Sequence, residues 1–328
     1  MYYPYLRGKQ FELLAIKEMA QDQSLTRVVH PVIEPVRDLN SGGLERCVET
    51  LLRVGSSCTL IVNPQVGHLA GDSSSVHKLV SFLNDRPHLL DHVTLGVVVS
   101  AVDDLESVQH NLSALNVGTP KVSFFHLDFP EDAAQVFGFY STSIVESHFV
   151  ESVSDTRRYR SLSGFQAVAP VWGVTPLVKW RDPFPRQARN IDYVGIPEQL
   201  YTDDHLYFAD DGFVGISDYQ TIGDDYQDGG RLPRAVVLHL TYQKESDGPI
   251  FIRHFPSDSN LDASDTAGKF AEAVKKLVSF ADERNLANPA IDKFRFYALN
   301  ESFPGLGTLK KVSIQNHIYV MQHALGEL

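Results

Sequence analysis

The stretch Thr94-Leu95-Gly96-Val97-Val98-Val99 is a nearly continuous apolar run and carries the plainest strand signal in the chain. Such a run is typical of a parallel strand that is covered on both faces, whereas a strand with one solvated face alternates apolar and polar residues. Asp103 and Asp104 follow, and carboxylates favour the first turn of a helix. The stretch therefore predicts one strand–helix unit of a parallel sheet.

The same order of strand and then helix recurs on both sides of this stretch, and it predicts βαβ units. A helix is also expected at residues 197–201, before the last strand. Units repeated in this way predict an α/β protein with a (β/α)8, TIM-barrel-like fold. The eight expected strands are residues 2–6, 28–33, 59–62, 94–99, 122–127, 142–149, 174–180 and 213–216.

The pattern changes after residue 222. Two β-rich runs separated by turn residues predict a β-hairpin, and apolar residues at helical spacing then predict two helices. These segments are residues 235–242, 250–255, 265–285 and 310–325. We therefore expect a barrel over residues 1–222 and a C-terminal appendage of hairpin and helices over residues 223–328, which packs on the barrel and is not an independent domain.

Composition excludes several classes of protein. No apolar run approaches the roughly 18 residues that span a bilayer, and the N-terminus lacks a basic segment followed by an apolar one. These features predict a cytoplasmic protein without a membrane partner, in which Cys47 and Cys58 are reduced core thiols. The formal charge of -12 means that a nucleic-acid partner would need a local basic patch.

The carboxyl ends of barrel strands meet at one rim, so residues that follow the strands are expected to share a site. Carboxylates there can act as general acids and bases or hold Mg²⁺ or Mn²⁺, and Arg and Lys can bind phosphate. The candidate catalytic residues, which are also the candidate metal ligands, are Glu34, Asp182 and Asp218. The candidate substrate-binding residues are Arg7, Lys9, Asn63, Arg186, Arg189, Asn190 and Tyr219.

The alternative for each of these residues is a helix cap or a turn, since strand ends favour Asp, Asn and Ser for structural reasons. Glu34 is the strongest functional candidate, because a lone acid in an apolar segment is costly to bury without a partner. His126 and His148 suit metal binding or proton transfer, or a place in the core. The sequence has no His-Glu-x-x-His motif and no closely spaced Cys-His set, so a zinc site is not expected.

Two further segments could bind an anion. Arg186 and Arg189 lie in a long polar loop, where they would cover a ligand or pair with Asp182 and Asp192 to close the loop. Glycines at residues 303–307 precede a helix that carries Lys310 and Lys311. A helix N-terminus of this kind can bind an anion, although turn and cap chemistry is the favoured interpretation of these residues.

Five segments together resemble an uncharacterised bacterial family related to the phage beta protein group. They are YYPYLRGKQ at residues 2–10, PVIEPV at 31–36, DPFPRQARNIDY at 182–193, DGFVGISDY at 211–219, and IRHF with SDSN at 252–255 and 257–260. The resemblance implies a barrel-like fold, residence on mobile elements, and a small nuclease-like protein encoded alongside. It implies phage defence or a toxin–antitoxin-like pair, and it assigns no catalytic residue.

These observations support three hypotheses. The first is a barrel hydrolase, of phosphodiesterase or nuclease type, that acts on an anionic phosphorylated substrate. The second is a non-catalytic partner or antitoxin-like regulator of the neighbouring nuclease. The third is a sensor that binds a nucleotide or another phosphorylated ligand without turning it over.

Overall fold

The computed structural model describes the chain except residues 73, 91, 101–103, 129–133, 230–232 and 327–328, so the expected helix-starting Asp103 lies outside the described residues. The chain divides into two compact units. Unit 1 comprises Met1–Arg181 and Tyr207–Asp218, and unit 2 comprises Asp182–Leu206 and Tyr219–Leu328. This division differs from the expected boundary after residue 222, because Asp182–Leu206 leaves the barrel and contributes to unit 2.

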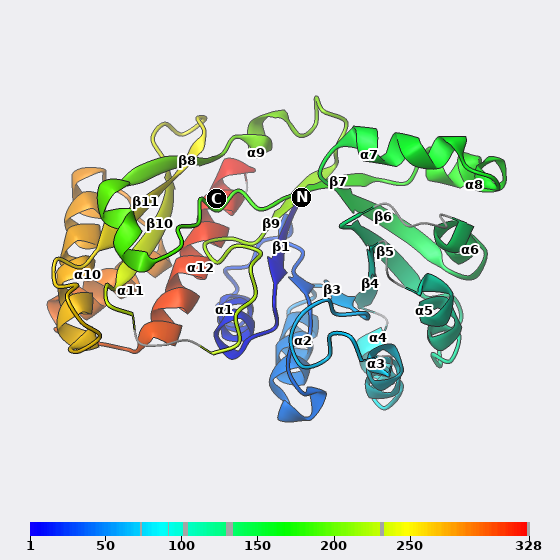
Figure 1. Cartoon of the computed structure of the whole chain (residues 1–328), viewed down its shortest axis with the longest axis horizontal. Helices are drawn as coiled ribbons and strands as arrows, with labels where there is room; N and C mark the ends of the chain where they lie inside the picture. Colours follow the sequence, from blue (N-terminus) through cyan, green and yellow to red (C-terminus); the bar gives the residue numbers. More distant parts are fainter. Residues whose placement is uncertain (73, 91, 101–103, 129–133, 230–232, 327–328) are drawn as a thin grey trace. The chain divides into compact units, whose positions relative to one another are not determined.

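Unit 1 is a closed barrel of eight parallel strands, which confirms the predicted (β/α)8 TIM-barrel-like fold (Figure 1). Its last strand, β9, pairs with both β7 and β1, and this pairing closes the sheet. The strands are β1 (Tyr2–Leu6), β2 (Val32–Ile33), β3 (Cys58–Ile61), β4 (Val93–Val99), β5 (Lys121–His126), β6 (Ile144–Val150), β7 (Leu177–Trp180) and β9 (Gly215–Asp218).

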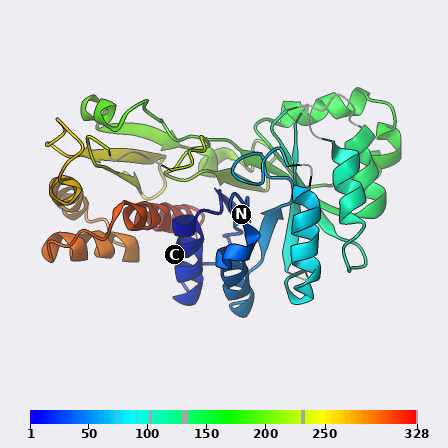
Figure 2. The same ribbon diagram turned by 60° about the horizontal axis from the view of Figure 1, so that its bottom comes forward.

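Helices lie outside this sheet, and α1 and α2 run side by side along it (Figure 2). The larger ones are α1 (Gln10–Gln21), α2 (Gly43–Arg53), α3 (Ser75–Asn84), α5 (Leu105–Leu112), α6 (Ala134–Thr142) and α8 (Phe165–Trp172). Shorter helical turns are η1 (Leu39–Ser41), α4 (Pro87–Leu90), α7 (Val153–Arg157) and η2 (Arg158–Ser161), whereas α9 (Asp204–Tyr207) lies mostly in unit 2. Cys47 on α2 and Cys58 on β3 are buried free thiols, as expected.

Strand β4 explains why the sequence predicts the barrel so clearly. Every residue of Val93–Val99 is buried, as a strand covered on both faces requires. Aromatic side chains fill the barrel beside it: Phe125 stacks on Phe149 with ring centroids 4.1 Å apart, and Tyr5 stacks on Trp180 at 5.4 Å. Large rings of this kind leave little space near the strand, and β4 accommodates them with a glycine at position 96.

Unit 2 contains a three-stranded antiparallel sheet in the order β10-β11-β8. Strands β10 (Val237–Gln243) and β11 (Ile250–Pro256) form the predicted hairpin, and β8 (Glu198–Thr202) pairs with the other edge of β11. The helix expected at residues 197–201 is therefore wrong. The segment is too short to be a stable helix alone, and the open edge of β11 supplies hydrogen bonds that an isolated turn lacks.

Three helices complete unit 2: α10 (Thr266–Glu283), α11 (Pro289–Leu299) and α12 (Leu306–Ala324), with a 3-10 turn, η3, over Asn190–Gly195. Helices α10 and α12 match expectation, whereas α11 was not predicted. The sequence contains a helix start signal here, because Asn288 caps the backbone N–H groups of Ala290 and Ile291 and a proline is the first residue of the helix. No helix in the described part of the chain combines the length and apolar character needed to cross a membrane.

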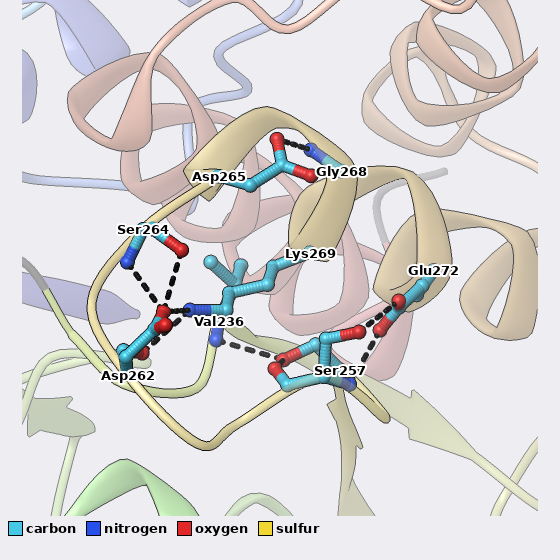
Figure 3. A network of polar contacts seen from close by, with 9 residues as sticks. Val236, Ser257, Asp262, Ser264, Asp265, Gly268, Lys269 and Glu272 are labelled. Atoms are coloured by element: carbon cyan, nitrogen blue, oxygen red, sulfur yellow. Dashed lines mark hydrogen bonds and ion pairs between the residues drawn. The ribbon is translucent and has the colours of Figure 1, made fainter.

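Local polar contacts fasten the loop between β11 and α10 (Figure 3). Asp265 caps α10 by accepting a hydrogen bond from Gly268 N at 2.9 Å, and Lys269 Nζ donates to the carbonyl of Asp262 at 2.6 Å. Ser257 Oγ accepts from Val236 N at 3.2 Å and donates to the Ser259 carbonyl at 2.9 Å. These contacts are turn and cap chemistry within the loop.

The packing around β4 predicts a cost for adding a single methyl group. A Cβ at Gly96 would lie 2.4 Å from Ile61 Cδ1 and 3.0 Å from both Phe125 and Thr59, so neighbours would have to shift. We expect Gly96→Ala to lower the free energy of unfolding by about 1–3 kcal/mol, measured by urea denaturation. Gly118→Ala, where a Cβ meets nothing within 4 Å, is the control. Equal stability of the two variants would contradict this description of the barrel interior.

Candidate functional site

The sequence-predicted residues fall into two groups. Arg7, Lys9, Glu34, Asn63 and Asp218 belong to unit 1, and Asp182, Arg186, Arg189, Asn190 and Tyr219 belong to unit 2. Two residues of the second group, Arg186 and Asn190, line a cavity within unit 2.

In unit 1, Glu34 is fully buried directly after β2. Its Oε2 accepts hydrogen bonds from the Tyr5 hydroxyl, at 2.9 Å, and from Nη1 of Arg7, and its Oε1 accepts from the backbone N–H of Gln65 at 2.6 Å. These donors come from β1 and from the segment after β3, on either side of β2. Arg7 and Glu34 are therefore brought together as predicted, and the buried acid is satisfied by an ion pair and two further donors.

The other predicted residues of unit 1 make structural contacts. Asn63 acts as an extra backbone partner for β4, since its side chain donates to Val98 O and accepts from Val98 N, both at 2.8 Å. Asp218 is buried and accepts from the Tyr2 hydroxyl at 2.7 Å. Lys9 occupies the position before the first residue of α1.

His126 and His148 form part of a buried hydrogen-bonded chain between the barrel and its helices. Tyr159 bonds His126 Nδ1 at 3.0 Å, His126 Nε2 bonds His148 Nδ1 at 2.9 Å, and His148 Nε2 bonds the Tyr140 hydroxyl at 2.7 Å. Burial lowers the pKa of His126 to about 3 and that of His148 well below its usual value, so both are neutral. This arrangement fits histidines of the core.

In unit 2, the two predicted arginines hold loops through ion pairs. Arg189 makes a two-point contact with Asp192, with Nη2–Oδ1 at 2.7 Å and Nε–Oδ2 at 3.2 Å, as the loop-closing interpretation expects. Arg186 pairs with Asp225 at 2.7 Å and not with Asp182. Both arginines are at the surface, where such pairs contribute little stability.

Asp182 links two loops of unit 2. Its Oδ1 accepts from Phe184 N at 3.0 Å and its Oδ2 accepts from Asp224 N at 2.8 Å. Burial raises the pKa of the Asp182 carboxyl to about 6, since it outweighs the two backbone donors, and the carboxylate of Asp224 acts in the same direction as burial. A carboxyl with this pKa exchanges its proton near neutral pH, which a general acid or base requires.

A cavity of 370 Å³ lies beside these loops, and we call it the unit 2 cavity. It gathers residues from the loop after Asp182, from the segment before β10, from β10 itself and from the first turns of α12. The polar and basic residues that line it are Arg186, Gln187, Asn190, Thr221, Gln227, His239, Lys310 and Ser313. The other described lining residues are Phe184, Ala188, Tyr193, Ile222, Pro233, Val236, Val237, Leu238, Leu306 and Leu309.

The lining is unusual for a chain of formal charge -12, because none of its described residues is an Asp or a Glu. Two lining residues, Arg186 and Lys310, are cationic, and Lys310 lies in the first turns of α12, where the helix dipole is positive. Asn190 also lines the cavity and donates to Ala235 O at 2.9 Å. Tyr219, by contrast, is buried and is not a lining residue.

The sequence-predicted residues Arg186 and Asn190 thus line the cavity, together with Lys310, for which the sequence favoured turn and cap chemistry, and His239, which was not considered. The available signal was a lone polar residue within the apolar run Val236-Val237-Leu238-His239-Leu240, the same kind of signal that singled out Glu34. Among the residues that the structure describes, no three His, Cys, Asp or Glu side chains are placed to hold a metal ion, and Glu34, Asp182 and Asp218 form no such group.

The fold defines the class of protein as a (β/α)8 barrel joined to a second unit of an antiparallel sheet and helices. Comparison with known proteins adds no family: neither a family model nor a curated protein matches the chain.

The buried ion pair of unit 1 predicts a large loss of stability when its acid is neutralised. In Glu34→Gln the mostly buried Arg7 guanidinium loses the negative charge that Glu34 supplies, so we expect the free energy of unfolding to fall by about 3 kcal/mol or more in urea denaturation. Glu49→Gln removes the acid of the exposed Arg53–Glu49 pair in the same unit and should cost less than about 0.5 kcal/mol. Similar losses in both variants would contradict the role assigned to Glu34.

Proposed function

We propose that the protein binds a small phosphorylated ligand in the unit 2 cavity. The observation that carries this proposal is a cavity with Arg186 and Lys310 in its wall and no carboxylate among its described lining residues. Its volume of 370 Å³ lies within the range of small-molecule sites. This assignment corresponds to the ligand-sensor hypothesis.

The chemistry of the wall favours an anion with an attached ring. Guanidinium and ammonium groups bind phosphate oxygens through charge-assisted hydrogen bonds, and the amides of Gln187 and Asn190 add neutral polar groups. Phe184 and Tyr193 provide aromatic faces on which a nucleobase or sugar can pack. A nucleotide or sugar phosphate offers both features.

The ion pair of Arg186 with Asp225 is compatible with this role. The Asp225 side chain is about half exposed, at 54%, so water screens the pair and little free energy is lost when it opens. A ligand phosphate, which carries more charge and more acceptor oxygens than a carboxylate, can compete for the guanidinium. Arg186 can therefore turn from Asp225 to the ligand.

We expect Lys310→Met to weaken ligand binding about tenfold, because one charge-assisted contact is lost. Calorimetric titration with inorganic phosphate, nucleoside monophosphates and sugar phosphates measures the effect. Lys311→Met removes the neighbouring lysine of α12, which does not line the cavity, and should leave affinity unchanged. Arg186→Gln should likewise weaken binding. Arg189→Gln is its control and should leave affinity unchanged, because Arg189 is not a lining residue.

The proposal fails if no member of this panel binds the wild-type protein. It also fails if Lys311→Met and Arg189→Gln weaken binding as much as their partners do, because the loss would then reflect overall charge and not the cavity.

A second candidate function is hydrolysis of the bound phosphate ester, which is the hydrolase hypothesis with its site moved into unit 2. The observation that favours it is the raised pKa of Asp182, about 6, on the loop that also carries Arg186. Asp182 accepts from the backbone of Phe184, a lining residue, so it is held next to the cavity wall. In its ionised form it would take a proton from an attacking water.

Hydrolysis by this route should depend on pH in a defined direction. The base works when ionised, so turnover should rise as pH increases through about 6 and level off above it. Asp182→Asn should lower phosphate release at least about 100-fold while binding persists. Asp192→Asn, on the same loop but paired with Arg189, is the control and should retain turnover. If the wild-type protein binds the ligand but does not turn it over, the hydrolysis proposal fails and the binding proposal stands.

A further inference from the structure

Two histidines of unit 2 face each other across the hairpin. His239 on β10 and His254 on β11 are directly opposed in the antiparallel register, and their Nδ1 atoms are 2.7 Å apart. A contact this short between two ring nitrogens is a hydrogen bond, so one nitrogen carries a hydrogen and the other accepts it.

The surroundings of the pair are aromatic and largely dry. The ring of Tyr193 lies 4.9 Å from that of His239 and 4.4 Å from that of His254, and Phe184 meets His239 edge-on at 5.3 Å. Burial lowers the pKa of His239 to about 3 and that of His254 to about 4, with the neighbouring imidazole as a further cause for His239. Both rings are neutral at pH 7, and each therefore carries one N–H.

The position of the two protons follows from the environment of His254. Its residue is 2% exposed, and its Nε2 is buried without a hydrogen-bond partner among the described residues. If that nitrogen were protonated, it would be an unsatisfied buried N–H, which is costly and rare in proteins. The favoured arrangement places the His254 proton on Nδ1, donated to Nδ1 of His239. His239 then carries its own proton on Nε2.

We infer that His239 presents this Nε2–H to the unit 2 cavity as a neutral hydrogen-bond donor for a ligand oxygen, and that His254 is the positioning residue that fixes the tautomer. His239 lines the cavity, and its described contacts leave Nε2 without a protein partner. This inference rests on the proposed function and deepens it: beside the cations Arg186 and Lys310, the cavity holds a donor whose direction is fixed by the hairpin.

A fixed neutral donor narrows the ligand class. An N–H accepts nothing, so the ligand group that meets His239 must be an acceptor, such as a phosphate or carbonyl oxygen, and not an amine or ammonium. Because the ring is already oriented before binding, the hydrogen bond forms with little loss of side-chain entropy.

The tautomers can be read directly from ¹⁵N NMR of the imidazole rings at neutral pH, since protonated and unprotonated ring nitrogens have well-separated shifts. We expect a protonated Nε2 on His239 and a protonated Nδ1 on His254. On addition of inorganic phosphate, the His239 Nε2–H signal should move more than either nitrogen of His254. The opposite tautomers, or an unmoved His239 signal at phosphate saturation, would overturn the inference.

Affinity supplies a second measurement. His239→Phe retains an aromatic ring beside Tyr193 and Phe184 but no donor, and it should weaken phosphate binding about tenfold. His239→Gln, whose amide places an N–H near the position of Nε2, should retain most of the affinity. A thermal transition like that of the wild type confirms that each variant is folded. His254→Leu should leave His239 in place but mix its tautomers in the NMR spectrum.

The outcomes separate the two proposals. If phosphate binds and depends on Lys310 but is indifferent to His239→Phe, the role of His239 is wrong and the binding function stands. If wild-type protein does not respond to phosphate or to any ligand of the panel, the binding function fails and the donor role fails with it.

Discussion

Closure of the parallel sheet is the constraint on which the rest of unit 1 depends. Strand β1 pairs with β2 on one edge and with β9 on the other, so the first and last strands leave no open edge. The interior is then filled by rings from β1, β5, β6 and β7, and the buried Glu34 can be satisfied only because β1 and β3 bring donors to both sides of β2. Without the pairing of β2 to both β1 and β3, an acid in that apolar segment would lack these donors in a medium that does not solvate charge.

Much of this barrel could be predicted from the sequence, because parallel strands covered on both faces give apolar runs such as β4, and turn residues mark their ends. What the sequence could not show was where the chain leaves the barrel. Residues 198–202 form a strand only because β11, about 50 residues later in the chain, offers a free edge. Such a pairing is a long-range effect with no local signal. Helix α11 had a local signal, an asparagine cap followed by proline, that went unused.

The residues of the candidate site also differ in whether a local or a long-range feature of the sequence reveals them. Arg186 and Asn190 were predicted from loop chemistry, which is local, and the structure places both in the wall of one cavity, where Lys310 also lies. Asn63 and Asp218 were predicted from their position after strands, and they prove to be partners of the backbone of β4 and of Tyr2. His239 could have been found as a polar residue in an apolar strand, but its meaning depends on His254, which only the hairpin register brings opposite it. The sequence therefore predicts residues whose role depends on a neighbouring turn or helix end, but it does not predict contacts that depend on which strands pair.

The chain passes between the two units three times, after Arg181, after Leu206 and after Asp218. Unit 2 is for this reason a discontinuous domain, assembled from two separate stretches of polypeptide. During synthesis, strand β8 leaves the ribosome before its partner β11 exists, and it must wait while the barrel receives its last strand. A fragment that begins at Tyr219 would carry the hairpin and its helices but not β8, and β11 would then expose a bare sheet edge of the kind that recruits other chains. A contiguous fragment of unit 2 would therefore lose an internal strand pairing and gain a tendency to self-associate.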